Sequence, residues 1–191
     1  MLGIAIIPAG AKDQIGSSTV AGRPVTLFSD FTWEYAATPA ATNCSDVNGT
    51  IQFCGDTTRW KFTPTASPII AAQYQYDASQ YGEYIFERLG RSNGLTAETM
   101  TKIAVQNAAM AAQVNTSNVS VIEQANILFE GEPAITVVYT LKFQGLPIVF
   151  ANTIVVRDGY TVQIVTYAIM AEYTQAHRDL HAEFLQNTKL L

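Results

Sequence analysis

The sequence has few charged residues, and its basic residues are not clustered. Only 14% of its 191 residues are charged, whereas about 25% is usual in a soluble protein. The eleven Lys and Arg residues are scattered singly along the chain. A nucleic-acid-binding surface needs them in clusters that neutralise phosphates. With a formal net charge of −5 as well, the composition argues against a nucleic-acid partner and disfavours an anionic membrane surface.

Long apolar runs are also missing. No segment approaches the roughly 18 apolar residues of a membrane-spanning helix, so we expect no transmembrane segment. Residues 1–11 form a short apolar run ending in Ala9-Gly10-Ala11, which has the form of a signal-peptidase site but lacks a basic start. The run is interpreted either as a signal-peptide remnant or as an N-terminal strand or disordered end. We expect a secreted, periplasmic or extracellular protein with a single α+β domain over residues 12–191.

The glycine-rich patterns of common cofactor sites are not found. The chain contains neither GxxxxGK[ST] nor GxGxxG, which argues against phosphate-cradle and dinucleotide sites. Its only two histidines fall on one predicted helix, so a Ser-His-Asp triad is not expected. We therefore expect no cofactor and assign no catalytic residue, and a non-enzymatic role is favoured.

The only cysteines are Cys44 and Cys54. Asn48-Gly49 between them is a hairpin-turn signal, and a three-residue loop centred on Gly49, or a bulge, would bring the two cysteines opposite each other. We predict a disulfide, which suits an oxidising compartment. Two buried free thiols are the alternative. The spacing is not CxxC, so a redox or zinc role is not expected.

The first half of the chain is predicted to contain short strands and then two helices. A hairpin is expected between Gln14 and Tyr35, followed by a Thr- and Pro-rich excursion over residues 38–68. Residues 69–76 read as a strand. One helix is predicted from Asp77 to about Leu89, and the next, capped by Thr96, from residue 97 to about 113.

The last third, residues 119–191, is predicted to form a four-strand meander followed by an amphipathic helix over about 172–187. A turn at Asp158-Gly159 would pair Phe150 with Tyr167, and a turn at Gly145-Leu146 would pair Tyr139 with Asn152. Both faces of this sheet are too apolar to face water. We therefore predict an α+β fold, an antiparallel sheet with helices on both faces, which is an αβα sandwich.

A resemblance to a known family is carried by the order of several segments. These are Val25-Thr26-Leu27-Phe28 leading to Trp33, and residues 134–140, 152–156, 159–167 and 176–184. The chain resembles the Mog1/PsbP-like family of αβα sandwiches, in which a late strand follows Gly-Tyr and the final helix carries a Phe before a last apolar turn. Gly159-Tyr160 and Phe184-Leu185 match those features. The longer excursion and the two consecutive helices depart from the family. Most members are non-catalytic, so the resemblance implies an accessory or binding role and transfers no site residue.

Three sets of residues are candidates for binding. Aromatic residues near loops and strand ends would form a recognition surface if exposed, or core packing if buried; they include Trp33, Trp60, Tyr74 and Tyr76. The polar pair Asn152 and Gln163 would line a pocket if the sheet curled as in NTF2-like proteins. His177 and His181, spaced i and i+4, could bind a metal or could simply favour a helix C-terminus.

Together these patterns predict an exported accessory protein that binds an unknown protein or small ligand, with a homodimer as one arrangement. The alternatives are an NTF2-like small-ligand-binding or hydrolytic domain, and a metal-binding protein that uses the two histidines.

Overall fold

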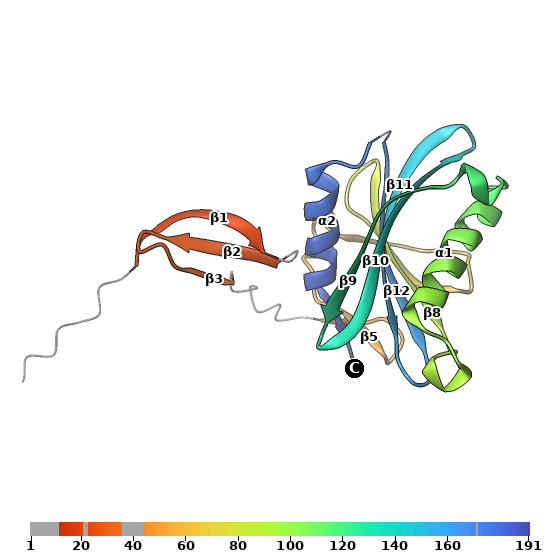
Figure 1. Ribbon diagram of the computed structural model, residues 1–191, viewed down its shortest axis with the longest axis horizontal. Helices are drawn as coiled ribbons and strands as arrows, with labels where there is room; N and C mark the ends of the chain where they lie inside the picture. Colours follow the sequence, from red (N-terminus) through yellow and green to blue (C-terminus); the bar gives the residue numbers. More distant parts are fainter. Residues whose placement is uncertain (1–11, 21–22, 36–43, 171) are drawn as a thin grey trace, which may run out of the picture. The chain divides into compact units, whose positions relative to one another are not determined.

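The structure is a computed structural model that describes residues 12–20, 23–35, 44–170 and 172–191. The signal-peptide prediction over residues 1–11 lies outside the described residues. The chain divides into two compact units, residues 1–39 and residues 40–191 (Figure 1). None of the described helices is both long and apolar enough to cross a membrane.

The first unit is a small antiparallel sheet. Its strand order is β1 (Gln14–Val20), β2 (Arg23–Phe28) and β3 (Trp33–Tyr35). The predicted hairpin is confirmed by the pairing of Ser18 with Val25. The third strand adds an edge-to-face contact between Trp33 and Tyr35, whose ring centroids are 5.3 Å apart.

The second unit is built on a seven-stranded antiparallel sheet. Its strands, in spatial order, are β6 (Lys61–Thr63), β7 (Ile70–Gln75), β8 (Gln80–Glu87), β12 (Thr161–Ile169), β11 (Leu146–Val156), β10 (Glu132–Phe143) and β9 (Ser120–Phe129). A separate small sheet has the order β13 (Thr188–Leu190), β5 (Ile51–Phe53) and β4 (Ser45–Asp46). Two short 3-10 helices, η1 (Arg91–Asn93) and η2 (Thr116–Asn118), flank the first long helix.

The C-terminal meander forms as predicted, with one change of register. Phe150 pairs with Tyr167 across β11 and β12, as the turn at Asp158-Gly159 requires. Tyr139 pairs with Phe150 and not with Asn152, so the predicted pairing of β10 and β11 is wrong by two residues. The turn is Gln144-Gly145, where φ is 50° and 85°. Two successive positive φ angles are what a tight hairpin turn of this twist requires. A shift of two residues leaves every side chain on its predicted face.

Helices cover both faces of this sheet, as expected, and Figure 1 shows them on opposite sides. α1 (Ala97–Ala111) begins after Thr96, whose hydroxyl caps the first turn as predicted. It packs Met100 and Ala104 on β10 and β11. α2 (Gln175–Gln186) packs Leu180 and Phe184 on the other face. The α+β sandwich is therefore confirmed.

The predicted helix from Asp77 to Leu89 is wrong, because this segment is the strand β8. The Asp77 side chain accepts a hydrogen bond from the Ser79 amide at 2.7 Å within a tight turn, and does not cap a helix. Aromatic and β-branched residues of the segment, such as Tyr84 and Ile85, favour a strand when it lies between two others. The change removes one predicted departure from the Mog1/PsbP-like fold.

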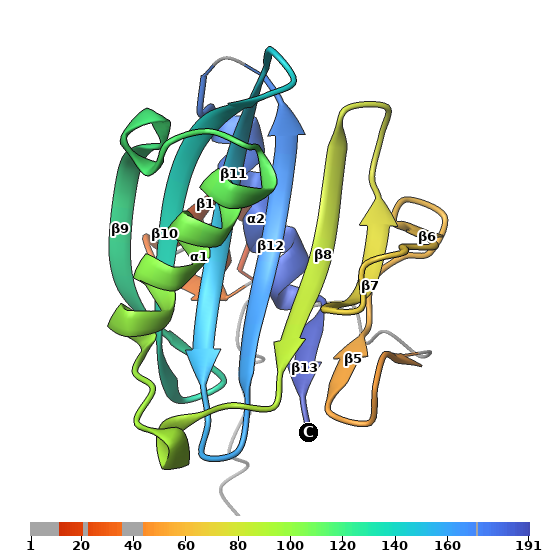
Figure 2. The same ribbon diagram turned by 90° about the vertical axis from the view of Figure 1, so that its right-hand side faces the viewer.

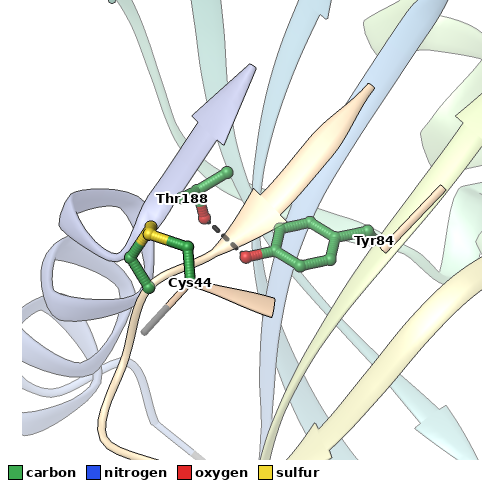
Figure 3. Close-up of a disulfide and its surroundings, with 4 residues drawn as sticks. Cys44, Tyr84 and Thr188 are labelled. Atoms are coloured by element: carbon green, nitrogen blue, oxygen red, sulfur yellow. Dashed lines mark hydrogen bonds between the residues drawn. A yellow bond between two sulfur atoms is a disulfide. The ribbon is translucent and has the colours of Figure 1, made fainter. Parts of the chain in front are cut away.

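The predicted disulfide between Cys44 and Cys54 is present (Figure 3). Ser45 pairs with Phe53 across β4 and β5, which places the two cysteines opposite each other just outside the small sheet. The Cys54 amide donates to the Asn187 carbonyl at 2.6 Å. The disulfide therefore fastens the excursion beside the end of α2.

Replacing both Cys44 and Cys54 with serine should lower the free energy of unfolding by about 2–3 kcal/mol, because the unfolded chain loses a short covalent loop. The two residues are separated by 10 positions. Urea unfolding of wild type and variant measures the difference. A reductant should shift the wild-type midpoint and leave the variant unchanged. Equal midpoints for the oxidised wild type and the variant would contradict the prediction.

Candidate functional site

A row of aromatic rings crosses the sheet on the face that carries α1. Tyr81, Tyr167, Phe150 and Tyr139 are successive cross-strand partners on β8, β12, β11 and β10. Their centroids are 5.0, 5.6 and 5.1 Å apart, with interplanar angles of 13°, 35° and 12°. The rings therefore stand side by side across the sheet, with the two outer pairs stacked and the middle pair tilted.

One end of this aromatic row is covered and the other is open. α1 contacts β10 and β11, and Tyr139 is buried beneath it. Figure 2 shows α1 lying over these strands, while no described helix lies over β7 and β8 on that side. Tyr81 and Tyr167 are accordingly only half-buried. The row thus leads from the core to an accessible part of the sheet.

The accessible part contains a buried carboxyl group. Glu83 on β8 is 9% exposed and pairs with Val165 on one side and Gln73 on the other. The Gln73 amide nitrogen donates to Glu83 Oε2 at 3.2 Å and to the Tyr167 hydroxyl at 2.8 Å. Gln75 donates to the Tyr81 hydroxyl at 3.3 Å. We call these five residues, Gln73, Gln75, Tyr81, Glu83 and Tyr167, the Glu83 face.

Burial changes the acid–base properties of this face. Desolvation raises the pKa of Glu83 to about 7, and the hydrogen bond from Gln73 only partly opposes this. The pKa of Tyr167 is raised above its usual range by burial, with the charge of Glu83 contributing. Near neutral pH the face therefore holds the neutral hydroxyl of Tyr167, two side-chain amides and one carboxyl group that is partly protonated. Such a set is suited to binding polar groups.

The sequence did not identify the Glu83 face. The sequence predicts a helix over this segment, and on a helix Tyr81 and Glu83 do not share a face. Once β8 is a strand, period-two alternation puts them together. The spacing of Gln73 and Gln75, two residues apart on β7, is the sequence feature that indicates a polar stripe on one face of this strand.

The predicted polar pair Asn152 and Gln163 lies on the same side of the sheet as α1. Asn152 donates from its side-chain nitrogen to Gln163 Oε1 at 2.8 Å. Both residues are buried. α2 does not cover them, since it packs on the opposite face. An NTF2-like pocket lined by this pair stays a prediction.

The predicted aromatic set is divided among different places. Trp60 and Tyr74 are buried with Phe184 on the α2 side of the sheet, where their rings lie 4.8 and 6.1 Å from it. The Tyr76 ring lies tilted against Trp60, with the centroids 4.8 Å apart. Trp33, 47% exposed, belongs to the other unit. These residues mostly serve packing, although Trp60 and Tyr74 also line a cavity of about 340 Å³ beside β4.

The two histidines face the sheet from α2 and are buried. The Thr166 hydroxyl lies 3.2 Å from His177 Nε2 and 2.9 Å from His181 Nδ1. The Thr153 hydroxyl lies 2.8 Å from His181 Nε2. Desolvation lowers the pKa of His177 to about 4 and that of His181 to about 3, the latter with a contribution from His177. Both are therefore neutral at pH 7.

Metal binding by this pair stays a prediction. Among the described residues, no group of three or more His, Cys, Asp and Glu side chains is placed to hold a metal ion. The threonine hydroxyls already engage three of the four ring nitrogens. The observed arrangement gives the histidines a packing and hydrogen-bonding role between helix and sheet.

The segment before α1 contains one further sequence pattern. Residues 90–94 read Gly-Arg-Ser-Asn-Gly, which matches the Gly-x-Ser-x-Gly of many serine hydrolases. Here they form the 3-10 turn η1, and the Ser92 hydroxyl donates to the Asp158 carbonyl at 2.6 Å. A Cβ at Gly90 would lie 2.1 Å from the Arg157 carbonyl oxygen, so glycine is needed for this close approach. Both histidines of the chain bind threonines from α2. The pattern is a structural turn.

Comparison with known proteins places the fold. No family model matches the chain, and no curated protein matches it either. The solution structure of cyanobacterial PsbP (CyanoP) from Synechocystis sp. PCC 6803 matches with a TM-score of 0.58 and 11% identity, over 81% of this chain and 95% of that chain. PA94 from Pseudomonas aeruginosa, of unknown function, matches with a TM-score of only 0.36 and 12% identity, over 90% of this chain and 87% of the other.

The chain therefore has a PsbP-like fold. This confirms the resemblance found in the sequence. At 11% identity the likeness concerns the arrangement of helices and strands alone.

Proposed function

We propose that the protein is an exported, non-enzymatic accessory protein that binds a partner protein through the Glu83 face. The observation that carries this proposal is the open end of the aromatic row beside α1. Tyrosine is enriched at the centres of protein interfaces, because it combines a large apolar ring with a polar end. The half-buried Tyr81 and Tyr167 supply such a surface.

The shape of the Glu83 face supports a protein partner. Its residues come from three adjacent strands, β7, β8 and β12, and lie on the surface of the sheet. Small-molecule sites are usually concave and bury most of their ligand. A face spread over neighbouring strands is better matched to another protein surface.

Export is supported by the disulfide. The bond between Cys44 and Cys54 is of a kind that persists in oxidising compartments and is rare in the cytosol. We therefore place the partner in the periplasm or outside the cell.

Replacing Tyr81 with alanine should weaken partner binding about tenfold or more, as loss of an interface anchor typically does. The partner is captured on the immobilised chain from the exported-protein fraction of the source organism. Its dissociation constant is then measured for each variant. Met110→Ala, at a position 68% exposed on α1, is the matched control and should bind like the wild type.

Circular dichroism checks that both variants are folded. Equal affinities for the wild type and Tyr81→Ala would refute the proposed surface. A partner found only in the cytosolic fraction would refute export.

A further inference from the structure

Glu83 is a buried acid, and its electrostatic surroundings are unusual. Among the described residues no Lys, Arg or His forms an ion pair with it, and its hydrogen bond comes from the neutral amide of Gln73. The titratable groups that face it are tyrosines: Tyr167 on β12 and Tyr139 on β10, whose pKa values its charge helps to raise. A buried carboxylate lacking a cation is unfavourable. Because Glu83 lies beside an accessible surface, a cation from a binding partner could reach it and offset the cost of its burial.

We propose that the partner inserts a Lys or Arg side chain into the Glu83 face, where its N–H groups bind the Glu83 carboxylate. This inference rests on the proposed function, because it takes the Glu83 face as the binding surface. It adds the chemical identity of the group that the surface recognises.

Unused acceptor atoms on the Glu83 face favour a partner group that donates hydrogen bonds. Both protons of the Gln73 side-chain nitrogen are used, one on Glu83 and one on Tyr167. Within the part of the chain that the structure describes, the carbonyl oxygen of Gln73 and Glu83 Oε1 are acceptors without a hydrogen bond, whereas Glu83 Oε2 already accepts one. Ammonium and guanidinium groups have only donors, and so they match this set.

The stacking of the rings argues against a cation held by ring faces. Cation–π binding needs a positive charge over the face of a ring. Tyr81 is stacked on one face of Tyr167 at 5.0 Å, and Phe150 lies tilted against the other face at 5.6 Å, so rings cover both faces of Tyr167. A quaternary ammonium would therefore find no open face on the Tyr167 ring, and it has no N–H to donate to Glu83. The site should distinguish it from Lys and Arg.

The charge of the whole chain is consistent with a basic partner. A formal net charge of −5 attracts a positively charged surface over a long range and speeds encounter. Glu83 would then give specificity at short range, since it becomes fully charged only when the incoming cation compensates for its burial.

Carbon-13 NMR of the Glu83 carboxyl group tests the site itself. The probes are n-butylammonium, n-butylguanidinium and tetramethylammonium chlorides at equal ionic strength, and Glu83→Gln assigns the resonance. The first two probes should lower the pKa of Glu83 by about one unit or more at saturation, as a nearby opposite charge does. Tetramethylammonium should leave it unchanged. No response, or an equal response to all three salts, would overturn the proposal.

The partner-capture assay tests whether the cation belongs to a protein. Glu83→Gln keeps the shape and removes the charge, and it should weaken partner binding about tenfold or more. If Tyr81→Ala weakens binding but Glu83→Gln does not, the proposed function stands and the cation proposal fails. If neither variant weakens binding, both fail. Probe binding without an effect of Glu83→Gln on the partner would overturn the protein source of the cation and indicate a free amine.

Discussion

Replacing Phe184 with alanine should lower the free energy of unfolding by about 3–5 kcal/mol. Phe184 is fully buried where α2 meets the sheet. Its ring stacks on Tyr84 at 5.0 Å and lies 4.8 Å from Trp60 and 5.7 Å from Phe53. Its removal leaves a cavity among rigid rings that cannot collapse to fill it. Denaturant unfolding followed by tryptophan fluorescence measures the loss.

Gly82 provides an internal control for this cavity. A Cβ at Gly82 would lie 2.7 Å from the Phe184 ring, so Gly82→Ala alone should also destabilise the fold. In the double variant the added methyl group occupies space that Phe184 has vacated. The two losses should then be clearly less than additive. Strict additivity, or a loss below about 1 kcal/mol for Phe184→Ala, would contradict this account of the α2 packing.

Lowering the pH from 7.5 to 4.5 should destabilise the Glu83→Gln variant by on the order of 5 kcal/mol. His177 and His181 are buried as neutral rings, with pKa values of about 4 and about 3 in the folded protein against 6.5 for the ordinary side chain. Below pH 6.5 the two histidines bind protons in the unfolded chain but remain neutral in the folded chain. The stability that the two neutral histidines contribute is therefore fully present above pH 6.5. It is lost as the pH drops toward their pKa values in the folded protein.

The Glu83→Gln background is needed because Glu83 acts in the opposite direction. Its pKa is raised from 4.5 to about 7, so the folded protein binds the extra proton between these values. Protonation of Glu83 therefore stabilises the folded wild type as the pH falls. The wild type should lose less free energy of unfolding in acid than the Glu83→Gln variant does. Urea unfolding at several pH values measures both slopes. The pH slope should be shallower when His177→Gln is added, and a histidine titrating near 6.5 by NMR would disprove the explanation.

The sequence predicts correctly those parts of the fold that depend on residues close together in the chain. Thr96 marked the start of α1, since a hydroxyl can cap only the turn that follows it. Asp158-Gly159 determined the pairing of β11 with β12, which the structure reproduces residue by residue. Cys44 and Cys54 could be paired because they are the only cysteines and a turn signal lies between them.

Other assignments required partners distant in the chain. Tyr81 and Tyr84 recur at a spacing that fits one face of a helix, so the sequence favoured a helix, and the strand became clear only with β7 and β12 on either side. The two histidines looked like candidate ligands on an amphipathic helix. Their hydrogen bonds to Thr153 and Thr166 depend on how α2 lies across the sheet.

The sequence by itself thus determined the α+β class, the meander, the disulfide and the resemblance to the PsbP-like fold. These follow from periodicity and turn chemistry within short segments. The tertiary structure alone decided that Glu83 is buried, that none of the described residues forms an ion pair with it, and that it lies beside the open end of an aromatic row. The physical reason is that burial and electrostatic environment arise from groups on different strands, and their proximity is created only when the sheet assembles.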